Sequence, residues 1–488
     1  MIDFSSMTAL EIGAGIKRGD FTSPEVTKAL FDIIDKKDGK LNAYITLCRD
    51  DAIESAKEVQ KLIDAGKLTS PLAGVPISIK DNICTKGIKT SCASKILGEF
   101  KPPYNATVVE RLNEAGLVLA GKLNMDEFAM GSTTETSYYG VTRNPWDTAK
   151  VPGGSSGGAA AAIAAAEAVC ALGSDTGGSI RQPAAYCGIT GFKPTYGAVS
   201  RYGLIAYASS LDQIGPMARD MADCAAIMDI ICGKDKYDGT SLELENTSYL
   251  DALNDNIKGV RIALPKECFE DDFDVEVKEK VLAVAETLKS QGAIIEEIAL
   301  PFMKYVIPTY YILATAEASS NLSRFDGVKY GFRAKDCSNL ADLYEATRSE
   351  GFGEEVKKRI MLGTFVLSSG YYEAYYKKAL QVKAMIKQSF DEIFSKYDLV
   401  LTPTAPITAP KLGESLNASL KMYKSDVFTV SANIAGLPAI SIPCGFDKNG
   451  MPIGAQFMGA PLSDQKVLNA GYAYQNITDF HKQRPEVM

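Results

Sequence analysis

The residues of this chain whose types and spacing could do chemistry are serines in two glycine-rich segments. Residues 153–158 are Gly-Gly-Ser-Ser-Gly-Gly, and residues 175–181 are Asp-Thr-Gly-Gly-Ser-Ile-Arg. Glycines let several backbone N–H groups point at one spot without obstruction by side chains. The amides of Thr176, Gly177 and Gly178 could stabilise the oxyanion that forms when Ser179 attacks a carbonyl. A tight turn capped by a hydroxyl is the alternative for either segment taken alone.

Serine chemistry in this chain needs a base other than histidine. The only histidine is His481, near the C-terminus, which disfavours a Ser-His-Asp or Cys-His hydrolase and a histidine-rich metal site. Lysine is the remaining candidate for activating Ser155 and Ser179. An ordinary lysine has a pKa of ~10.4, and burial lowers it by up to ~3–5 units, which is the shift required near neutral pH. Spacing alone does not select which lysine serves.

Strand and helix patterns suggest how these residues are positioned. Val75, Ile77 and Ile79 alternate with Pro76, Ser78 and Lys80, which predicts a strand with Lys80 on the face opposite the aliphatic residues. A helix is expected to start at the sequence Thr-Ser-Pro-Glu of residues 22–25, and a second to cover 51–65 and stop at Gly66. These two helices form a predicted helical lead-in over about 1–66.

The rest of the chain alternates between helical and strand patterns. Helical segments are expected at 107–115 and in the alanine-rich stretch 159–168, and strands at 118–120 and 169–172, which favours an α/β core. Helical periodicity at 277–289, 354–367 and 379–394 predicts an added helical layer, or insertion, over about 270–396. Strand character returns at 399–402 and 439–442. We therefore expect a single α/β domain spanning 1–488, with the cluster Tyr371, Tyr372, Tyr375 and Tyr376 as aromatic core rather than an interface.

Several motifs together resemble the amidase signature family. They are residues 74–81 (Gly-Val-Pro-Ile-Ser-Ile-Lys-Asp), the two serine segments, and residues 191–195 (Gly-Phe-Lys-Pro-Thr). The resemblance implies a large mixed β-sheet flanked by helices. It also implies a Ser-cisSer-Lys triad in which Ser179 is the nucleophile, Ser155 follows a cis peptide and relays the proton, and Lys80 is the base.

Within that family, residues 124–132, 143–147 and 359–364 resemble the tRNA-dependent amidotransferase branch. This implies a glutaminase that forms a glutamyl ester on Ser179 and releases ammonia. A partner subunit would use the ammonia, with ATP and Mg, to convert Glu-tRNA(Gln) to Gln-tRNA(Gln), and the assembly implied is a heterotrimer with B and C subunits. By the same resemblance, the substrate-binding residues would be Gly131, Ser132, Tyr310, Arg359 and Asp426.

Composition limits the other possibilities. The formal net charge of −8 gives no overall attraction to nucleic acid, so a partner is expected to hold the tRNA, and no apolar run long enough to span a membrane occurs. The start of the chain lacks a secretory signal, so the cytoplasm is expected. The ten cysteines, without any Cys-x-x-Cys pair, are expected to be small buried hydrophobes.

Two motifs in the chain match known signatures only in part. Residues 116–123 lack the hydroxyl of a phosphate-binding loop, and Ser463 in the Ser-x-x-Lys of 463–466 is better placed as a helix cap. Two alternatives to the glutaminase stay open. They are a free-standing amidase of the same family that acts on another small amide, and a non-catalytic scaffold subunit.

Overall fold

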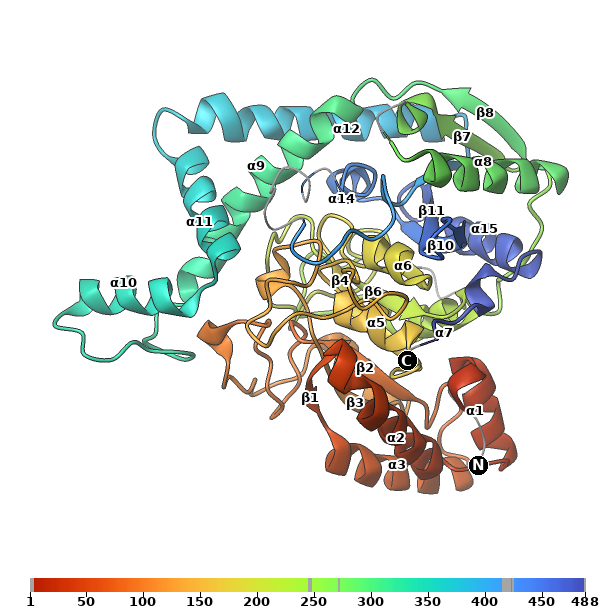
Figure 1. Ribbon diagram of the computed structural model, residues 1–488, viewed down its shortest axis with the longest axis horizontal. Coiled ribbons are helices and arrows are strands. Elements are labelled where there is room, and N and C mark those ends of the chain that lie inside the picture. The colour runs from red at the N-terminus through yellow and green to blue at the C-terminus, as the bar shows by residue number, and fades with distance from the viewer. Residues whose placement is uncertain (1–3, 245–247, 271–272, 415–422, 424, 487–488) are drawn as a thin grey trace.

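A mixed β-sheet of eleven strands organises the part of the chain that the structure describes (Figure 1). The computed structural model describes residues 4–244, 248–270, 273–414, 423 and 425–486. The strands are β1 (Tyr44–Leu47), β2 (Pro76–Lys80), β3 (Val118–Leu123), β4 (Cys170–Asp175), β5 (Thr190–Lys193), β6 (Gln213–Ala218), β7 (Arg261–Pro265), β8 (Ile294–Ile298), β9 (Leu399–Pro403), β10 (Ala439–Phe446) and β11 (Pro452–Gly459). Their order across the sheet is β1-β3-β2-β4-β6-β5-β10-β11-β9-β7-β8.

Parallel pairs occupy two separate parts of this sheet. Strand β2 pairs in parallel with β3 and β4, and β7 with β8 and β9, while the central strands are antiparallel. The described α-helices are α1 (Ala9–Arg18), α2 (Ser23–Leu41), α3 (Arg49–Asp64), α4 (Thr107–Glu114), α5 (Gly157–Ala164), α6 (Arg181–Cys187), α7 (Met221–Ile231), α8 (Val275–Ser290), α9 (Met303–Asn321), α10 (Leu340–Gly351), α11 (Glu354–Leu367), α12 (Lys378–Phe394), α14 (Val430–Ala435) and α15 (Asp464–Asn476). The predicted α/β class, a large mixed sheet with flanking helices, is confirmed.

The lead-in helices begin and end where their sequence signals lie. Thr22 and Glu25 form a capping box at the start of α2, in which the Thr22 N–H donates to the Glu25 carboxylate at 2.7 Å, and Pro24 lies in the first turn. Helix α3 ends at Asp64, and Gly66 follows in the left-handed region with φ of 66°. Residues 1–3 of the predicted lead-in lie outside the described residues.

Strand β3 is longer than predicted and includes residues 118–123 of the partial phosphate-loop motif. Its Lys122 is buried, and the Nζ atom donates to the Ile83 carbonyl at 2.7 Å and to Thr90 Oγ1 at 2.9 Å. This lysine therefore links two segments of the chain and does not project from a loop. Ser463 directly precedes α15, but its hydroxyl donates to the Ala460 carbonyl at 2.7 Å, so it makes no side-chain cap.

The alanine-rich helix α5 is completely buried between neighbouring backbone segments. It starts at Gly157 instead of residue 159 and ends at Ala164, because Ala166 takes a left-handed conformation with φ of 62°. A Cβ atom on Gly158 would overlap the carbonyl oxygen of Asn124. Small residues therefore let this helix approach the backbone closely, as the sequence predicted.

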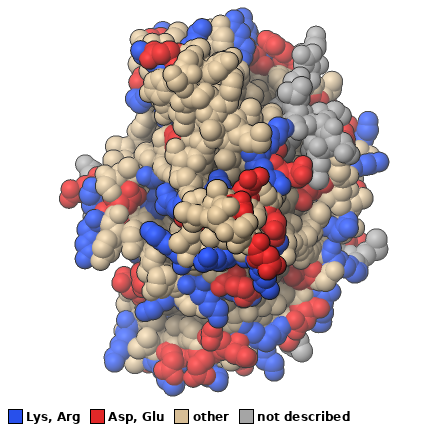
Figure 2. Space-filling model, turned by 90° about the vertical axis from the view of Figure 1, so that its left-hand side faces the viewer, with Lys and Arg blue, Asp and Glu red and all other residues tan. Residues whose placement is uncertain are grey.

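Helices α9, α11 and α12 form an arm at the left and top of the molecule in Figure 1, with α10 projecting beside it. The helices predicted at 277–289, 354–367 and 379–394 are observed as α8, α11 and α12, while β8 lies within the same range and joins the main sheet. The prediction of an aromatic core in this region is wrong. Tyr371, Tyr372 and Tyr375 are 44%, 41% and 42% exposed. Figure 2 shows uncharged side chains gathered on this side of the molecule.

Eight of the ten cysteines are buried, and Cys232 and Cys337 are half-buried. Within the described ranges, the apolar stretches of the helices are all too short to cross a membrane.

Candidate active site

Lys80 ends strand β2 with its amine enclosed by serines of the first glycine-rich segment. The side chain is fully buried, and Nζ lies 2.8 Å from Ser155 Oγ, 2.9 Å from Ser156 Oγ and 3.2 Å from the Ser174 carbonyl oxygen. Burial lowers the pKa of Lys80 to about 7, against the opposing effect of the Asp126 and Asp175 carboxylates. The amine is therefore available in its neutral form near neutral pH, which a general base requires.

The Gly154–Ser155 peptide bond is cis, as the family resemblance implies. Gly154 is needed here because a Cβ atom would overlap Asp126 Oδ2 and the backbone of Ser132 and Thr133. The Gly154 N–H donates to Gln182 Oε1 at 3.0 Å, and the Gln182 amide in turn donates to the Ser132 carbonyl at 3.0 Å. Gln182 thus ties the residue before Ser155 to the segment that carries Ser132.

Ser179 lies on the turn between β4 and α6, next to the first serine segment. Its side chain is 8% exposed, and the Ser156 N–H donates to the Ser179 carbonyl at 3.1 Å. The structure therefore brings the two glycine-rich segments together, as predicted. The Ser179 hydroxyl has no hydrogen-bond partner among the described residues.

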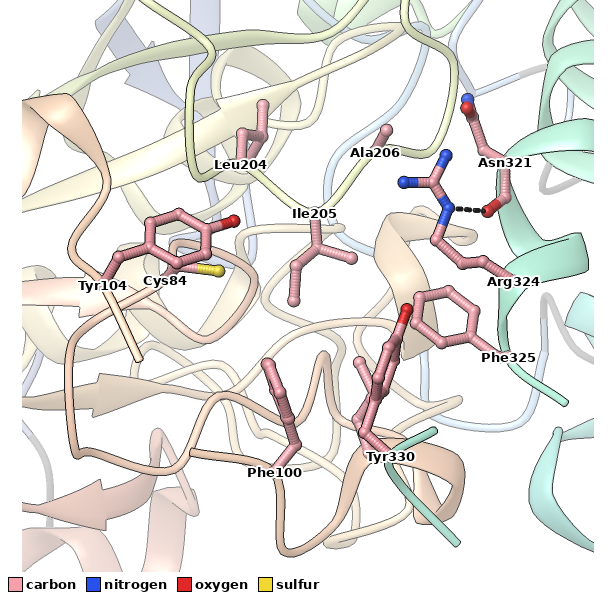
Figure 3. A pocket seen from close by; sticks show the side chains of 11 residues that line it. Cys84, Phe100, Tyr104, Leu204, Ile205, Ala206, Asn321, Arg324, Phe325 and Tyr330 are labelled. Carbon is pink, nitrogen blue, oxygen red and sulfur yellow. Dashed lines mark hydrogen bonds between the residues drawn. The ribbon is translucent and has the colours of Figure 1, made fainter. Parts of the chain in front are cut away.

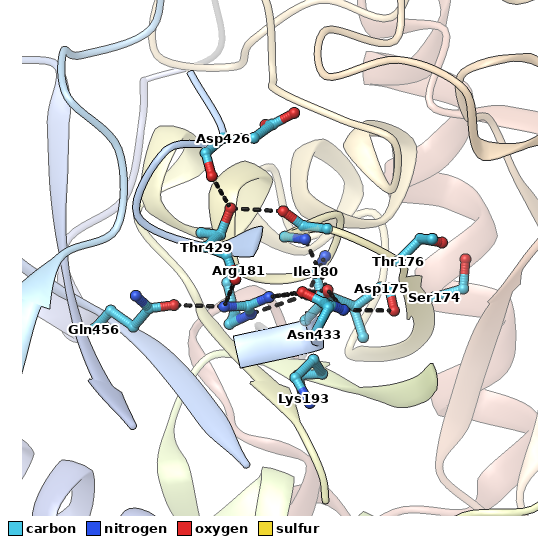
Figure 4. A network of polar contacts seen from close by, with 12 residues as sticks. Ser174, Asp175, Thr176, Ile180, Arg181, Lys193, Asp426, Thr429, Asn433 and Gln456 are labelled. Carbon is cyan, nitrogen blue, oxygen red and sulfur yellow. Dashed lines mark hydrogen bonds and ion pairs between the residues drawn. The ribbon is translucent and has the colours of Figure 1, made fainter. Parts of the chain in front are cut away.

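A buried ion pair fixes the shape of this turn (Figure 4). Arg181 Nη2 and Nε lie 3.0 Å from the two carboxylate oxygens of Asp175, and both side chains are fully buried. Burial alone would raise the pKa of Asp175, but the charge of Arg181 and its hydrogen bonds hold that pKa below its ordinary value. The guanidinium also donates to Asn433 Oδ1 at 2.7 Å and Gln456 Oε1 at 2.6 Å.

The Asp175 carboxylate also orders the amides that precede and follow Ser179. It accepts from Gly178 N–H at 2.8 Å and from Ile180 N–H at 3.1 Å. The Gly178 amide therefore already donates to Asp175, whereas we expected it to be a free donor of the oxyanion hole. The amides of Thr176, Gly177 and Ser179 have no acceptor within the described part of the chain and stay available to a ligand.

Arg359, on α11, is buried within reach of several tyrosines. Only 2% of the residue is exposed; Nε donates to Glu355 Oε1 at 2.8 Å and Nη1 to Tyr207 OH at 2.8 Å. The guanidinium also lies over the Tyr311 ring, with Cζ 5.4 Å from the centroid. Nη2 has no acceptor among the described residues, so it can receive a ligand carboxylate.

Asp426 lies beside Tyr311, the tyrosine whose ring the Arg359 guanidinium covers. Ser132 Oγ donates to both of its carboxylate oxygens, at 3.0 and 2.8 Å, and Tyr311 OH lies 3.3 Å from Oδ2. Burial raises the pKa of Asp426 to about 7, while the Ser132 hydrogen bond and the charge of Arg359 oppose the shift. Tyr311 contacts both predicted charged residues, so the structure places Arg359 and Asp426 in one region.

The remaining predicted residues lie between this charged region and the Ser179 turn. A Cβ atom on Gly177 would meet the Tyr310 ring, 2.5 Å from Cζ, so the tyrosine covers the turn. A Cβ atom on Gly131 would overlap the Asp126 carboxylate, which accepts from Thr134 N–H at 2.9 Å. Gly131 therefore acts through close backbone packing, and Ser132 through its bond to Asp426.

Sequence reasoning missed Ser156, Tyr207, Tyr311 and Asp212. Asp212 accepts from Thr176 Oγ1 at 2.7 Å and from Tyr207 N–H at 2.9 Å, so it ties the Ser179 turn to the tyrosine beneath Arg359. Ser156, adjacent to Ser155 in a glycine-rich segment, carried a usable signal. The other three carried none, because their contacts join segments far apart in the chain.

A separate cavity of about 160 Å³ is lined in part by Leu204, Ile205 and Ala206, the residues directly before Tyr207 in the chain (Figure 3). It is lined by Phe100, Tyr104, Ile205, Phe325 and Tyr330, with Arg324 beside Asn321. It contains none of the predicted site residues. Within the described residues, no group of three or more His, Cys, Asp or Glu side chains is placed to hold a metal ion.

Comparison with known proteins agrees with this geometry. The family model described as Amidase matches residues 25–468. The A subunit of the glutamyl-tRNA(Gln) amidotransferase of Lachnospira eligens is 59% identical over 96% of this chain and 97% of its own length. The protein of the same name from Agathobacter rectalis is 55% identical over 99% of this chain and 96% of its own.

Solved structures give the same result. The crystal structure of the corresponding glutamyl-tRNA(Gln) amidotransferase protein from Thermotoga maritima has a TM-score of 0.82 and 40% identity, covering 100% of this chain and 99% of that one. The native peptide amidase of Stenotrophomonas maltophilia has a TM-score of 0.82 and 28% identity, covering 99% of each chain. With the fold and these matches in agreement, the chain belongs to the amidase family.

Proposed function

We propose that this chain is the glutaminase component of a tRNA-dependent amidotransferase. The observation that carries the proposal is the buried Lys80 amine, 2.8 Å from Ser155 Oγ and next to the turn that presents Ser179. Lys122 is also buried, but its amine links two segments of the chain, whereas the Lys80 amine contacts the hydroxyls of two serines next to the Ser179 turn, which is where a general base would act. The names of the most similar relatives support the choice of amidotransferase.

The reaction begins with attack of Ser179 Oγ on the side-chain amide carbon of glutamine. The Ser179 proton passes to Ser155 Oγ, and the Ser155 proton passes to neutral Lys80 Nζ, so the charge ends on the amine. The oxyanion is stabilised by the amides of Thr176, Gly177 and Ser179. Protonated Lys80 then returns the proton through Ser155 to the leaving nitrogen, and ammonia departs from the glutamyl ester.

Water completes the cycle along the same proton path. It loses a proton toward Lys80 as it attacks the ester carbonyl, and Ser179 recovers its hydroxyl proton when glutamate leaves. The three residues therefore serve both half-reactions along one proton path.

Glutamine is held by its two charged backbone groups. Arg359 Nη2 receives the α-carboxylate, and ionised Asp426 receives the α-ammonium. Tyr310 covers the substrate above the Ser179 turn, while Ser132 keeps the Asp426 carboxylate oriented.

The ammonia is passed to a partner. In the assembly we propose, a B subunit binds ATP and Mg and activates Glu-tRNA(Gln), a C subunit completes the heterotrimer, and the complex acts in the cytoplasm. This chain itself needs no cofactor for the glutaminase step.

An assay of glutamine hydrolysis, alone and with the partners, ATP and Glu-tRNA(Gln), tests the proposal. We expect hydrolysis that the partners enhance. We also expect Ser179→Ala to abolish glutamine-dependent amidation but to leave ammonia-dependent amidation intact, because free ammonia bypasses this site. Hydrolysis of unrelated amides without preference for glutamine would instead indicate a free-standing amidase, and inertness toward all amides would indicate a scaffold.

A further inference from the structure

A long apolar groove lies on the surface of the helical arm, on the outer side of α12. It encloses about 890 Å³ between α12 and the connection from β8 into α9. Its apolar lining includes Ile298, Pro301, Val382, Met385 and Ile393. None of the predicted catalytic or substrate-binding residues contributes to it.

The groove extends along α12 at helical spacing. Its apolar residues on α12 are Val382, Met385, Ile386 and Ile393, so the stripe runs for about 17 Å of helix. Met385 at its middle is 65% exposed, which is unusual for a large apolar side chain on a surface otherwise rich in charge. An apolar stripe of this length matches the face of an amphipathic helix of similar length.

The rim of this groove is basic although the chain is acidic. Its charged lining residues are Lys304, Lys378, Lys396 and a single glutamate, Glu392, in a chain of net charge −8. None of the three lysines forms an ion pair within the described part of the chain. Lys304 instead lies over the Tyr305 ring, with Nζ 5.0 Å from the centroid. Three lysines without carboxylate partners around an apolar floor are complementary to an apolar segment flanked by acidic residues.

We propose that the α12 groove binds a segment of a partner protein in the amidotransferase, an amphipathic helix with an apolar face and acidic residues on either side. The inference rests on the proposed function, which requires partner subunits to use the ammonia. The groove lies away from the triad, so a partner seated there leaves the catalytic residues untouched. The lysines set the orientation and speed of docking, and the apolar floor supplies most of the affinity.

A pair of methionine variants tests the apolar floor in the full complex. Met385→Asp should weaken association of this chain with its co-expressed partners by at least about tenfold, because it places a charge in the centre of the buried contact. Met361→Asp is the matched control, since Met361 is 72% exposed on α11 and lies outside the groove. Size-exclusion chromatography and dissociation rates measure the loss. Equal loss in both variants, or no loss in Met385→Asp, overturns the proposal.

The basic rim is tested by charge reversal and by crosslinking. A Lys378→Glu/Lys396→Glu variant should bind the partner more weakly and with less dependence on salt, whereas Lys387→Glu, elsewhere on α12, should not. A photoreactive benzoylphenylalanine at position 389 should crosslink to a partner peptide with an apolar core and acidic flanks, identified by mass spectrometry. Crosslinking to a second copy of this chain, to a peptide without acidic flanks, or to nothing in an intact complex overturns the inference.

The experiments distinguish a failure of the groove assignment from a failure of the proposed function. Glutamine hydrolysis by the isolated chain should be unchanged in every groove variant, since no catalytic residue is altered. If the crosslink forms but the complex does not amidate Glu-tRNA(Gln), the function fails and the groove assignment stands. If amidation is normal and the groove variants assemble like the unaltered chain, the groove assignment alone fails.

Discussion

At the scale of single residues, the burial of Lys80 decides whether this site can work. A lysine in water is almost wholly protonated at neutral pH, and only the loss of hydration brings its pKa to about 7. The contacts to Ser155, Ser156 and the Ser174 carbonyl then fix the direction of the amine. In the proposed mechanism Ser156 keeps the amine aligned while Ser155 exchanges protons, so the two adjacent serines have different uses.

This environment predicts how the rate depends on pH. Because Lys80 acts as a base and its pKa is about 7, kcat for glutamine hydrolysis should rise with increasing pH through about 7 and then level off. Lys80→Arg should lower kcat by at least about a hundredfold, because arginine stays protonated at accessible pH. Steady-state rates of ammonia release between about pH 5 and about pH 9 measure both effects.

Asp426 also titrates near pH 7, but its protonation should change KM and not kcat. Its pKa is also raised to about 7, and protonation removes the charge that holds the substrate ammonium. We therefore expect KM to rise as the pH falls through about 7, while the kcat profile follows Lys80. A kcat profile that is flat across this range in the unaltered chain would rule out Lys80 as the titrating base.

Arg359 is predicted to act in binding more than in the chemical step. Arg359→Ala should raise KM for glutamine by at least about tenfold and leave much of kcat at saturating glutamine, because the carboxylate contact is the same in ground and transition states. Arg359→Lys is the matched variant, since it keeps the charge but loses the contacts to Glu355 and Tyr207. A low rate that saturating glutamine does not restore would assign Arg359 a role in the chemical step.

The sequence pointed to Lys80, Ser155 and Ser179, which the structure places in two adjoining segments and a neighbouring strand, but to only part of their surroundings. Lys80, Ser155 and Ser179 lie within motifs of fixed spacing, so the resemblance could locate them. Tyr207 and Tyr311 carry no local signal, because their contacts to Arg359 depend on how distant segments pack. The sequence also could not show that the Asp175 carboxylate accepts a hydrogen bond from the Gly178 amide.

At the scale of elements, the corner between β4 and α6 depends on the Asp175–Arg181 pair. Arg181 lies in the first turn of α6 and Asp175 ends β4, so the pair joins the two elements on either side of Ser179. The carboxylate also orders the Gly178 and Ile180 amides. The turn that carries Ser179 is therefore held by a charge network and not by the glycines alone.

Removing one member of this ion pair should lower the free energy of unfolding more than removing both members. Arg181→Met leaves the Asp175 charge buried without a partner and should lower the free energy of unfolding by about 3–5 kcal/mol. The double variant Arg181→Met/Asp175→Asn should recover part of that loss, because no unpaired charge remains, but it should stay poorly active since the turn is less ordered. Urea denaturation with parallel glutaminase assays measures both. A double variant less stable than Arg181→Met would show that the charge is not the cause.

Predicted element boundaries failed where packing, and not local pattern, sets them. Periodicity located α11 at its observed bounds and α12 within one residue. Helix α5 was shifted because an alanine-rich stretch has no periodicity to mark its ends, and the conformation of Ala166 stops it. The tyrosines at 371–376 were assigned to the core because aromatic residues usually are buried, whereas here they lie on the π-helical segment Tyr372–Lys377 and the residue before it, mostly exposed.

At the scale of the whole molecule, the site is assembled from segments that are far apart in the chain, around the neighbouring strands β2 and β4. Lys80 ends β2, Ser155 precedes α5, Ser179 follows β4, and Arg359 comes from the helical arm. The lead-in is part of the same assembly. Its Tyr44 OH lies 2.8 Å from Ser78 Oγ on the Lys80 strand, and its Ala43 carbonyl accepts from the Asn124 N–H at 2.7 Å. Residues Phe31 and Ile34 of α2 pack in the same core as Ile77 and Ile79.

A chain that begins at residue 67 should therefore neither fold nor hydrolyse glutamine. The deletion removes β1 from the edge of the sheet and exposes the core behind Lys80, whose low pKa depends on exclusion of water. Tyr44→Phe is a milder variant that removes only one contact of the lead-in with the Lys80 strand. It should keep the fold and lose about 1 kcal/mol of stability, because only the hydrogen bonds of the hydroxyl are lost. Circular dichroism, thermal unfolding and ammonia release from both variants measure these effects. A truncated chain that unfolds cooperatively and still releases ammonia from glutamine would show that the lead-in is a separable module and that Lys80 is enclosed without it.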